Sequence, residues 1–364
     1  MNLPVNRNAE LNRLTIYRDP NRFATTLGVS EEAVALCREA LFVDLHIDTM
    51  IPERLWGYDP NVEHRHWLGG RFFGHLDVPR MAVAGLDAVM WSITTNPFRT
   101  QRGRWQTFLR NCARVTQMID KAPETLRWVR NPGDLNPTGQ LGIMLSIQGG
   151  NALDGAPESF WQDLPVPLLR VTLVHLTNSQ IGATSAPVSA LRTDRGLTAS
   201  GALLIERLNE ARIFVDLAHI HPVGFWQALD IHNNDRPPVV THTGVSGVRP
   251  HWRNLDDQQI KAISDRGGVI GIMAHQGFLR SASSGDGVEM IAAHIEHLWN
   301  VGGAQCAAIG TDFDGAIIPP KGFRSGLMYP RLVDLLMQRG HSMDKLEGLL
   351  GENFKRCFSE LRSA

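Results

Sequence analysis

The sequence has no excess of charge of either sign. Its 36 Lys and Arg residues are balanced by 37 Asp and Glu residues, which gives a net charge of −1. A general nucleic-acid binder normally carries a clear basic excess, so we expect no nucleic-acid partner. The same balance gives no reason to expect binding to an acidic membrane surface.

Long apolar runs and paired cysteines are also lacking. No run approaches 18 consecutive apolar residues, and the N-terminal residues contain no apolar segment with a cleavage site, so we expect neither a membrane span nor a signal peptide. The only four cysteines are Cys37, Cys112, Cys306 and Cys357. They form no C-x-x-C pair, and they are too few for disulfide bonds to stabilise a chain of this length. This usage predicts reduced thiols in a cytoplasmic protein. The balanced charge and the lack of a long apolar run also predict that the protein has no membrane partner.

The composition is that of a globular protein, with 43% hydrophobic and 20% charged residues. A chain of 364 residues is long enough for two or three domains, but an α/β barrel of about 250 residues folds as one domain. We find no internal repeat, low-complexity stretch or Pro/Gly/Ser-rich linker that would separate domains.

Short apolar runs rich in Val and Ile predict eight strands. The runs are nearly continuous rather than alternating, which is typical of parallel strands that are covered on both faces. They lie at residues 41–48, 86–95, 142–148, 168–175, 212–219, 238–242, 268–275 and 306–312.

Helical patterns lie between these strands, at residues 198–211, 255–266 and 287–301. Alternating strands and helices predict a parallel sheet, and eight such units predict a TIM-type (β/α)8 barrel. The alternative is an open, doubly wound sheet, which periodicity does not exclude. We therefore expect a single barrel domain over residues 1–364. It would carry loop insertions at 52–85 and 96–140, an N-terminal extension at 1–40 and a C-terminal tail with helices at 316–364.

Seven of the eight apolar runs end in a side chain that can bind a metal ion or, in one case, in glutamine, the amide counterpart of glutamate. In a parallel barrel these ends lie around one mouth, so residues far apart in sequence become neighbours. The residues are His46, Asp48, Gln148, His175, His219, His242, His275 and Asp312.

The pair His46 and Asp48 is placed to bind one metal ion, since residues i and i+2 of a strand point the same way. Imidazole and carboxylate together suit Zn²⁺, so zinc is the metal that we expect. Any one of these histidines taken alone is more often a hydrogen-bonded core residue, and that reading stays open for His175 and His275. We favour Asp312 over Asp314, which is also a good turn residue beside a glycine. Three further histidines, His64, His66 and His75, are interpreted as loop residues.

Several segments resemble the renal (membrane) dipeptidase family, whose members are zinc peptidases of the amidohydrolase superfamily. The matching segments occur in the family's order between about residues 40 and 360, which is more specific than any single motif. They are DLHIDTM, SIQGGNAL, VTLVHLTN, GLT with LNEARIFVDLAHI, PVVTHTG, RNLDD, GGVIGI, IGTDFDG and GENFKRCF. The resemblance implies a binuclear zinc site in a (β/α)8 barrel that hydrolyses dipeptides, and it suggests a homodimer.

The resemblance also implies roles for individual residues. His46 and Asp48 match the ligands of the first metal, and His219 and His242 match those of the second. His175 matches the histidine that binds substrate and faces the reacting carbonyl, and Arg253 matches the arginine that binds the substrate carboxylate. Asp312 matches the aspartate that handles the proton.

The sequence departs from the family at Gln148, where the family has a glutamate that bridges both metals. A glutamine offers one neutral carbonyl oxygen, and its NH₂ group cannot bind a metal. The site therefore loses one negative charge, which predicts weaker binding of at least one metal, a single-metal enzyme or an inactive relative. Alternatively, Gln148 still binds metal through its oxygen and hydroxide is the remaining bridge.

Three functional hypotheses follow. The first is a zinc-dependent dipeptidase that uses metal-activated hydroxide on short peptides with a free C-terminal carboxylate, including L-Xaa-D-Xaa dipeptides. The second is another amidohydrolase-type hydrolase, acting on an N-acyl amino acid, a cyclic amide or a lactone; a substrate without a carboxylate would not need Arg253. The third is a non-catalytic relative, for which Gln148 is the only support.

Overall fold

The structure is a closed parallel barrel of eight strands. The computed structural model describes residues 14–64, 70–96, 98–162, 164, 166–280 and 286–363. The ring runs β1-β2-β4-β5-β6-β7-β8-β9 and closes where β9 pairs with β1. The short strand β3 is not part of the ring and pairs in parallel with the first three residues of β4. The strands are β1 (Val43–Ile47), β2 (Ala88–Thr94), β3 (Leu126–Trp128), β4 (Leu141–Gln148), β5 (Leu168–Thr172), β6 (Phe214–Asp216), β7 (Val239–Thr243), β8 (Val269–Ile272) and β9 (Ala307–Ile309).

The predicted barrel is thus confirmed, and the closed ring excludes the open sheet. Each of the eight apolar runs overlaps one barrel strand, and β4 and β7 each extend one residue beyond their run, whereas β3 was not predicted. Several strands end earlier than their apolar runs, because the chain turns into loops at the mouth of the barrel. His175, His219, His275 and Asp312 therefore each lie three residues beyond the last residue of their strand.

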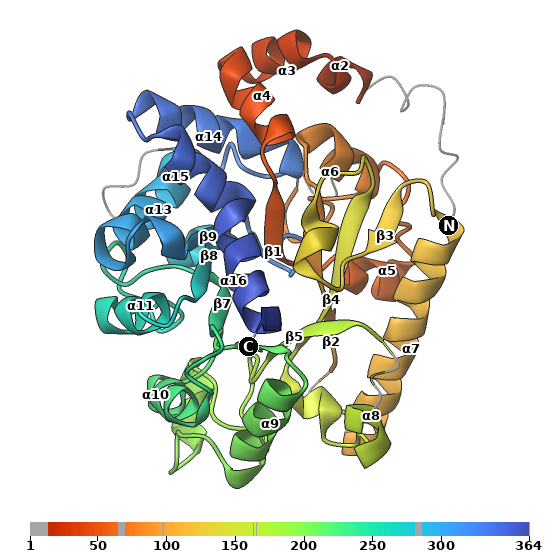
Figure 1. Cartoon of the computed structure of the whole chain (residues 1–364), viewed down its shortest axis with the longest axis vertical. Helices are drawn as coiled ribbons and strands as arrows, with labels where there is room; N and C mark the ends of the chain where they lie inside the picture. The colour runs from red at the N-terminus through yellow and green to blue at the C-terminus, as the bar shows by residue number, and fades with distance from the viewer. Residues whose placement is uncertain are drawn as a thin grey trace.

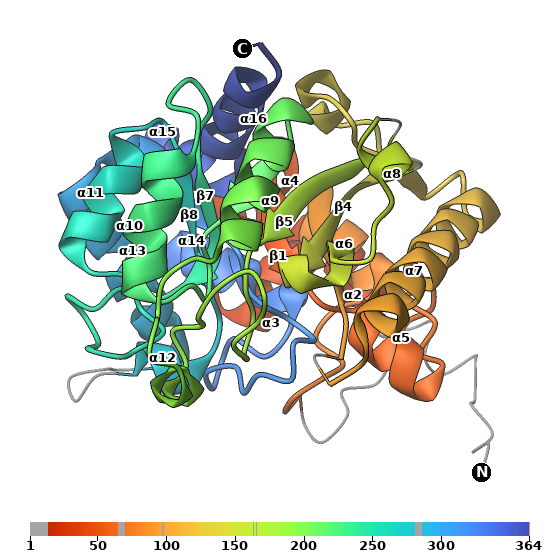
Figure 2. The same ribbon diagram turned by 90° about the horizontal axis from the view of Figure 1, so that it is seen from below.

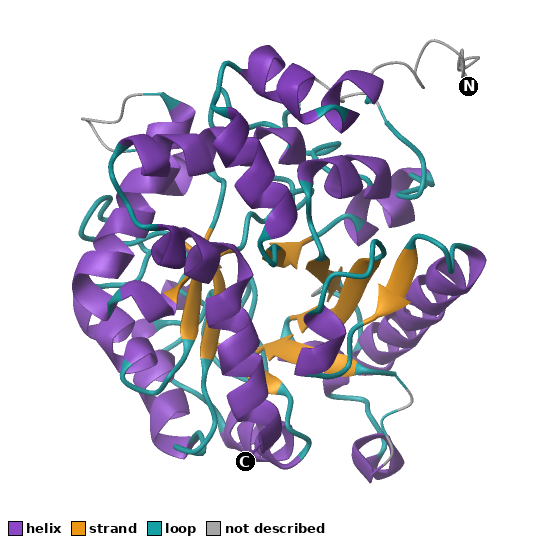
Figure 3. Cartoon of the chain, turned by 45° about the horizontal axis from the view of Figure 1, so that its top comes forward, coloured by secondary structure: helices purple, strands orange, loops and turns teal. Residues whose placement is uncertain are grey.

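Helices surround the ring of strands (Figures 1 and 3). The three predicted helices are present, and Thr198 caps α9 by accepting a hydrogen bond from the amide of Gly201. No helix in the described ranges is long and apolar enough to span a membrane. The helices are α2 (Thr15–Arg18), α3 (Pro20–Leu27), α4 (Glu31–Glu39), α5 (Met50–Trp56), α6 (Val78–Ala84), α7 (Gln101–Lys121), α8 (Glu158–Gln162), α9 (Ala199–Glu210), α10 (Pro222–Ile231), α11 (Asp257–Ser264), α12 (Gln276–Leu279), α13 (Gly287–Gly302), α14 (Tyr329–Gln338), α15 (Met343–Glu347) and α16 (Asn353–Ser363).

One end of the barrel is closed by α16. A core cluster takes apolar side chains from all eight barrel strands and from α16, and Phe214 at the start of β6 packs against Phe354 and Phe358 with ring centroids 5.7 and 6.0 Å apart. Figure 2 shows α16 on one side of the strands and α12, which follows β8, toward the opposite side. The carboxyl ends of the strands therefore form the end of the barrel that remains for a functional site.

Residues 14–42 form three short helices that pack against the barrel's outer layer. Leu14, Phe23 and Val34 form a small apolar cluster with Val83 of α6 and Leu327. Ser30, the N-cap of α4, donates its hydroxyl hydrogen bond to Asp334 of α14 at 2.6 Å. The N-terminal helices are therefore joined to a helix that follows the last strand.

A buried carboxylate joins β1 to the C-terminal part of the chain. Asp44 of β1 accepts hydrogen bonds from the hydroxyls of Thr311 and Tyr329, each at 2.6 Å. Burial raises the pKa of Asp44, and these donors oppose that rise. Because Asp44 lies two residues before His46, this network fixes the strand that carries the candidate ligand.

Replacing Tyr329 by phenylalanine should therefore destabilise the fold. The buried carboxylate would lose a donor, and a hydrogen bond to a charged group contributes about 1.5–3 kcal/mol. A matched control is Tyr58→Phe, since the Tyr58 hydroxyl donates to the neutral carbonyl of Leu76 and its loss should cost about 1 kcal/mol. Urea unfolding of both variants measures the difference. Equal losses in the two variants would contradict this account.

A second buried group makes stability depend on pH. His294 of α13 accepts a hydrogen bond from the amide of Val245 through Nδ1 at 2.9 Å, and its Nε2 lies 3.0 Å from the carbonyl oxygen of Leu279. Only the neutral ring fits this arrangement, since a second proton would face the Val245 N–H. Burial lowers the pKa of His294 from 6.5 to about 4.

The unfolded chain therefore takes up this proton first as the pH falls. The stability due to neutral His294 should be complete above pH 6.5 and should decrease as the pH falls from 6.5 toward 4. Between pH 7.5 and pH 5 the loss should be about 2 kcal/mol. Urea unfolding of wild type and His294→Gln at both pH values isolates this term, since glutamine keeps one donor and one acceptor without titrating. Identical pH dependence in the two proteins would exclude His294 as the source.

Candidate metal centre

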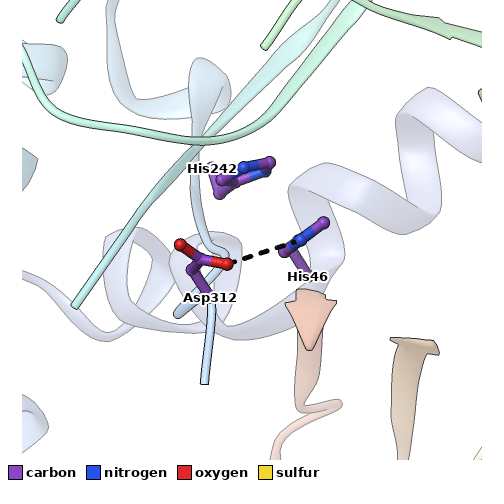
Figure 4. Close-up of side chains that lie close together, drawn as sticks. All are labelled: His46, His242 and Asp312. Atoms are coloured by element: carbon purple, nitrogen blue, oxygen red, sulfur yellow. Dashed lines mark ion pairs between the residues drawn. The ribbon is translucent and has the colours of Figure 1, made fainter. Parts of the chain in front are cut away.

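Three buried side chains from distant parts of the sequence meet at the mouth of the barrel. His46 comes from β1, His242 from β7 and Asp312 from the loop after β9, and one ligand atom of each lies within 4.8 Å of the others (Figure 4). The Nε2 atom of His46 lies 3.6 Å from Oδ1 of Asp312. Two imidazoles and a carboxylate in this arrangement form a site that can hold a metal ion.

Asp48 lies beside the same histidine. Its Oδ2 is 3.6 Å from Nε2 of His46, so the two side chains of the His-x-Asp pair do project to one place. The backbone amide of Asp48 donates to the carbonyl oxygen of Phe313 at 2.8 Å, which joins this segment to the loop after β9. The strand geometry expected from the sequence therefore brings both groups to the barrel mouth.

A second group of ligand candidates adjoins the first. The Nε2 atoms of His219 and His242 are 2.8 Å apart, and Nε2 of Gln148 lies 3.4 Å from each of them. Rotating the Gln148 amide by half a turn would place its oxygen toward both imidazoles instead. His46 stacks on His242 with ring centroids 3.8 Å apart, so His242 is shared by the two groups.

Two of these residues have backbone conformations that are rare for side chains with a Cβ atom. The φ angles of His219 and Asp312 are +65° and +61°. Such residues cost about 1–3 kcal/mol each and persist where the surroundings hold them. The amide of Asp312 donates to the His46 carbonyl at 2.9 Å, and the His219 carbonyl accepts from the amide of Ser185 at 2.7 Å. These contacts hold both loops with their side chains toward the site.

Unpartnered polar atoms show that the residues fit a cation. Among the described residues, Nε2 of His46, Oδ1 of Asp48 and Oε1 of Gln148 are buried and have no hydrogen-bond partner. Buried polar atoms are nearly always satisfied in folded proteins, so such a cluster indicates a place where these residues can bind a cation. Imidazole nitrogens and carboxylate oxygens are donors that a divalent metal prefers.

The histidines of the site are held in the neutral form by their surroundings. Burial lowers the pKa of His46, His219 and His242. Arg253 lowers the pKa of His219 and His242 further, whereas the Asp48 carboxylate opposes the fall at His46. Burial and the neighbouring Asp48 carboxylate raise the pKa of Asp312, while Arg253 opposes this rise. Neutral imidazoles are the form that binds metal.

A buried ion pair between Arg170 and Asp216 adjoins these ligand candidates, and it was not predicted. Arg170 of β5 is fully buried, and its guanidinium lies 3.2 Å from Oδ2 of Asp216 on β6. Its Nη2 donates to Nδ1 of His46 at 2.8 Å and to the hydroxyl of Ser146 at 2.9 Å. The available signal was a charged residue inside an apolar strand run, since a buried charge must be paired.

Asp216 also orients His242. The Thr241 hydroxyl lies 2.7 Å from Oδ2 of Asp216 and 3.0 Å from Nδ1 of His242. A carboxylate can only accept, so the hydroxyl donates to Asp216 and in turn accepts from the Nδ1–H of His242. The proton of His242 therefore lies on Nδ1, and the Nε2 lone pair is available to a metal.

His175 and Arg253 also lie at the site. His175 meets His219 edge to face with ring centroids 4.8 Å apart, and burial lowers its pKa to about 4. Arg253 is buried and donates to the carbonyl oxygen of His242 at 2.5 Å, while its Nε has no hydrogen-bond partner in the described part of the chain. Burial lowers the pKa of Arg253 to about 10, and the Asp312 carboxylate opposes this.

Other histidines and Asp314 have structural contacts instead. His275 is the N-cap of α12, and the Asp314 carboxylate accepts from the amides of Gly74 and His75 and from the Thr49 hydroxyl. Nε2 of His64 lies 2.6 Å from the Asp59 carbonyl oxygen. His66 lies outside the described residues.

Comparison with known proteins gives a match over most of the chain. The family profile described as membrane dipeptidase (Peptidase family M19) matches residues 30–364. An uncharacterized protein in the pqqA 5' region of Klebsiella pneumoniae is 37% identical over 173 residues, which cover 46% of this chain and 62% of that protein. Dipeptidase 3 of Mus musculus is 27% identical over 337 residues, which cover 91% of this chain and 66% of that protein. The chain thus spans less than two thirds of the length of either relative.

Solved structures share the fold. A metallo peptidase from Rhodobacter sphaeroides, liganded with a phosphinate mimic of the dipeptide L-Ala-D-Ala, superposes with a TM-score of 0.73 at 22% identity. The alignment covers 88% of this chain and 98% of that one. At this identity the likeness is one of architecture, and it agrees with the barrel described above.

Proposed function

The chain belongs to the membrane dipeptidase family, Peptidase family M19, and from that premise we propose that it is a zinc-dependent dipeptidase. Its substrates would be short peptides with a free C-terminal carboxylate. The observation that carries this proposal is the position of Arg253, a buried cation in contact with the backbone of the candidate ligand His242.

A buried guanidinium with an unpartnered N–H is well suited to bind an anion. Only one hydrogen bond of the Arg253 side chain is made within the described residues, to the His242 carbonyl, and its Nε–H is unpartnered. The fixed fork of an arginine binds a carboxylate through two parallel hydrogen bonds. A substrate carboxylate held there would place the adjacent peptide bond beside the metal-ligand group.

The other site residues then take these roles. We propose His46, Asp48, His219, His242 and the Gln148 oxygen as metal ligands, and zinc as the metal. When bound, such a metal lowers the pKa of a coordinated water toward 7 and polarises the substrate carbonyl. His175 would donate a hydrogen bond to the carbonyl oxygen as negative charge develops on it. Asp312 would take up the proton of the attacking water and pass it to the leaving amine.

The stereochemistry of the substrate belongs to this proposal as well. The ligand of the Rhodobacter sphaeroides metallo peptidase mimics a dipeptide whose C-terminal residue is D-alanine. We therefore include L-Xaa-D-Xaa dipeptides among the substrates, with L-Ala-D-Ala as the first to be tried.

The experiment is a substrate panel with purified protein and added Zn²⁺. It compares L-Ala-L-Ala, L-Ala-D-Ala, the corresponding dipeptide amides, an N-acyl amino acid and a lactone. We expect turnover of a free dipeptide and much slower turnover of its amide, which lacks the carboxylate. Turnover of the lactone alone would favour a different amidohydrolase reaction. No turnover of any compound by folded, metal-loaded protein would overturn the proposal and favour a non-catalytic relative.

A further inference from the structure

Arg170 places a permanent positive charge directly behind the metal-ligand residues. Its guanidinium bonds to residues of four other barrel strands, and the side chain is completely buried. Those partners are His46 of β1, Met90 of β2, Ser146 and the Ile147 carbonyl of β4, and Asp216 of β6. A side chain held by so many contacts cannot swing away when a cation binds nearby.

The contact with His46 fixes where the imidazole carries its proton. A guanidinium can only donate, so Nδ1 of His46 accepts, and the proton of the neutral ring lies on Nε2. That N–H points toward the carboxylates of Asp48 and Asp312, each with an oxygen 3.6 Å away. A histidine that binds metal through one nitrogen normally donates from the other to an acceptor. The Nδ1 atom of His46 faces a donor, Arg170, whereas the Nδ1 atom of His242 faces the expected acceptor, the Thr241 hydroxyl.

The charges around the site also favour a single metal ion. Asp44 and Asp216 accept hydrogen bonds from hydroxyl and backbone groups, and Asp216 is further paired with Arg170. Among the described residues, this leaves Asp48 and Asp312 as the carboxylates that can balance the charge of a bound ion, which is enough for one divalent ion. Gln148, which lies beside His219 and His242 in the second ligand group, is neutral and adds no charge.

We propose that Arg170 takes the electrostatic place of a second metal, so that the centre binds one divalent cation with His242 as its principal histidine ligand. With its Nδ1 lone pair bonded to Arg170 and its proton on Nε2, His46 leaves the set of ligands proposed above. This inference rests on the proposed metal site. It assigns Arg170 as a positioning residue that acts through His46 rather than on substrate. Gln148 and Arg170 then act together, one by withholding a negative charge and the other by supplying a positive one.

Metal titration of the purified, metal-free protein tests this directly. Zn²⁺ or Co²⁺ binding is measured by calorimetry and by elemental analysis after gel filtration. Wild type should bind one equivalent, with any second ion at least 100-fold weaker. Gln148→Glu alone should still bind one, because Arg170 remains. The double variant Gln148→Glu/Arg170→Gln should bind two, whereas Gln148→Glu/Arg170→Lys, which keeps the charge, should not.

Each outcome decides a separate point. Two ions bound by wild type with affinities within tenfold of each other would overturn the proposal. Two ions bound by Gln148→Glu alone would remove any role for Arg170. Circular dichroism checks the fold, and the wild type and Gln148→Glu results remain decisive even if the Arg170 variants do not fold. Stoichiometry is independent of turnover, so one bound metal without dipeptide hydrolysis would contradict the proposed function and leave this inference intact.

Discussion

Replacing Arg253 by alanine should lower kcat/KM for a dipeptide by about 100- to 1000-fold, because removing one partner of a buried charge pair costs roughly 2–5 kcal/mol. The substrate carboxylate would enter a buried site without its cation. Arg253→Lys should recover only part of the loss, since an ammonium cannot form the two parallel hydrogen bonds. The measurement is kcat and KM for L-Ala-D-Ala in wild type and both variants.

Two controls separate carboxylate binding from general damage. Arg249 lies in the same loop, only half buried, and Arg249→Ala should leave kcat/KM within about threefold of wild type. The dipeptide amide has no carboxylate, so its slow hydrolysis should be nearly unchanged by Arg253→Ala. An equal loss on the free dipeptide and its amide would show that Arg253 supports the site through its bond to the His242 carbonyl and does not bind the substrate.

The barrel could be predicted from the sequence because the apolar character of its strands is a local feature of the sequence. Strands covered on both faces must be apolar throughout, so runs such as the one before Gln148 are visible without a structure. The candidate ligands were also predictable, because the strand ends of a parallel barrel share one mouth. His46, Asp48, His219 and His242 are brought together as expected.

The buried ion pair beside the ligands could not be predicted, because it joins residues of two strands and no local sequence pattern reveals it. Arg170 stands within a strand run, and its partner Asp216 lies on the next strand of the barrel after a long loop and helix. In the sequence, each of the two is simply a single charged residue within an apolar run. Their register, Arg170 beside Phe214 and Thr172 beside Asp216, exists only once the strands are aligned. The tautomers of His46 and His242 follow from that alignment and from nothing nearer in sequence.

Replacing His242 by alanine should have the largest effect on the metal centre. His242 belongs to both ligand groups, lying 2.8 Å from His219 and stacked on His46. Its Nε2 lone pair is available because Thr241 accepts the Nδ1–H. A catalytic metal supplies several kcal/mol of transition-state stabilisation, so loss of the metal should reduce dipeptide turnover by about 1000-fold or more. Elemental analysis of the purified variant should find little zinc.

His275→Ala is the matched control, since His275 also ends an apolar run at the barrel mouth but caps α12 instead of joining the ligand groups. It should retain the metal content of wild type and lose less than about tenfold in activity, as expected for a residue with a local capping role. If His275→Ala loses its metal while His242→Ala keeps it, the assignment of ligands at the mouth is wrong. If both variants keep the metal and only His242→Ala loses activity, His242 acts on the substrate, and the ion is held by the other proposed ligands, among them Asp48 and His219.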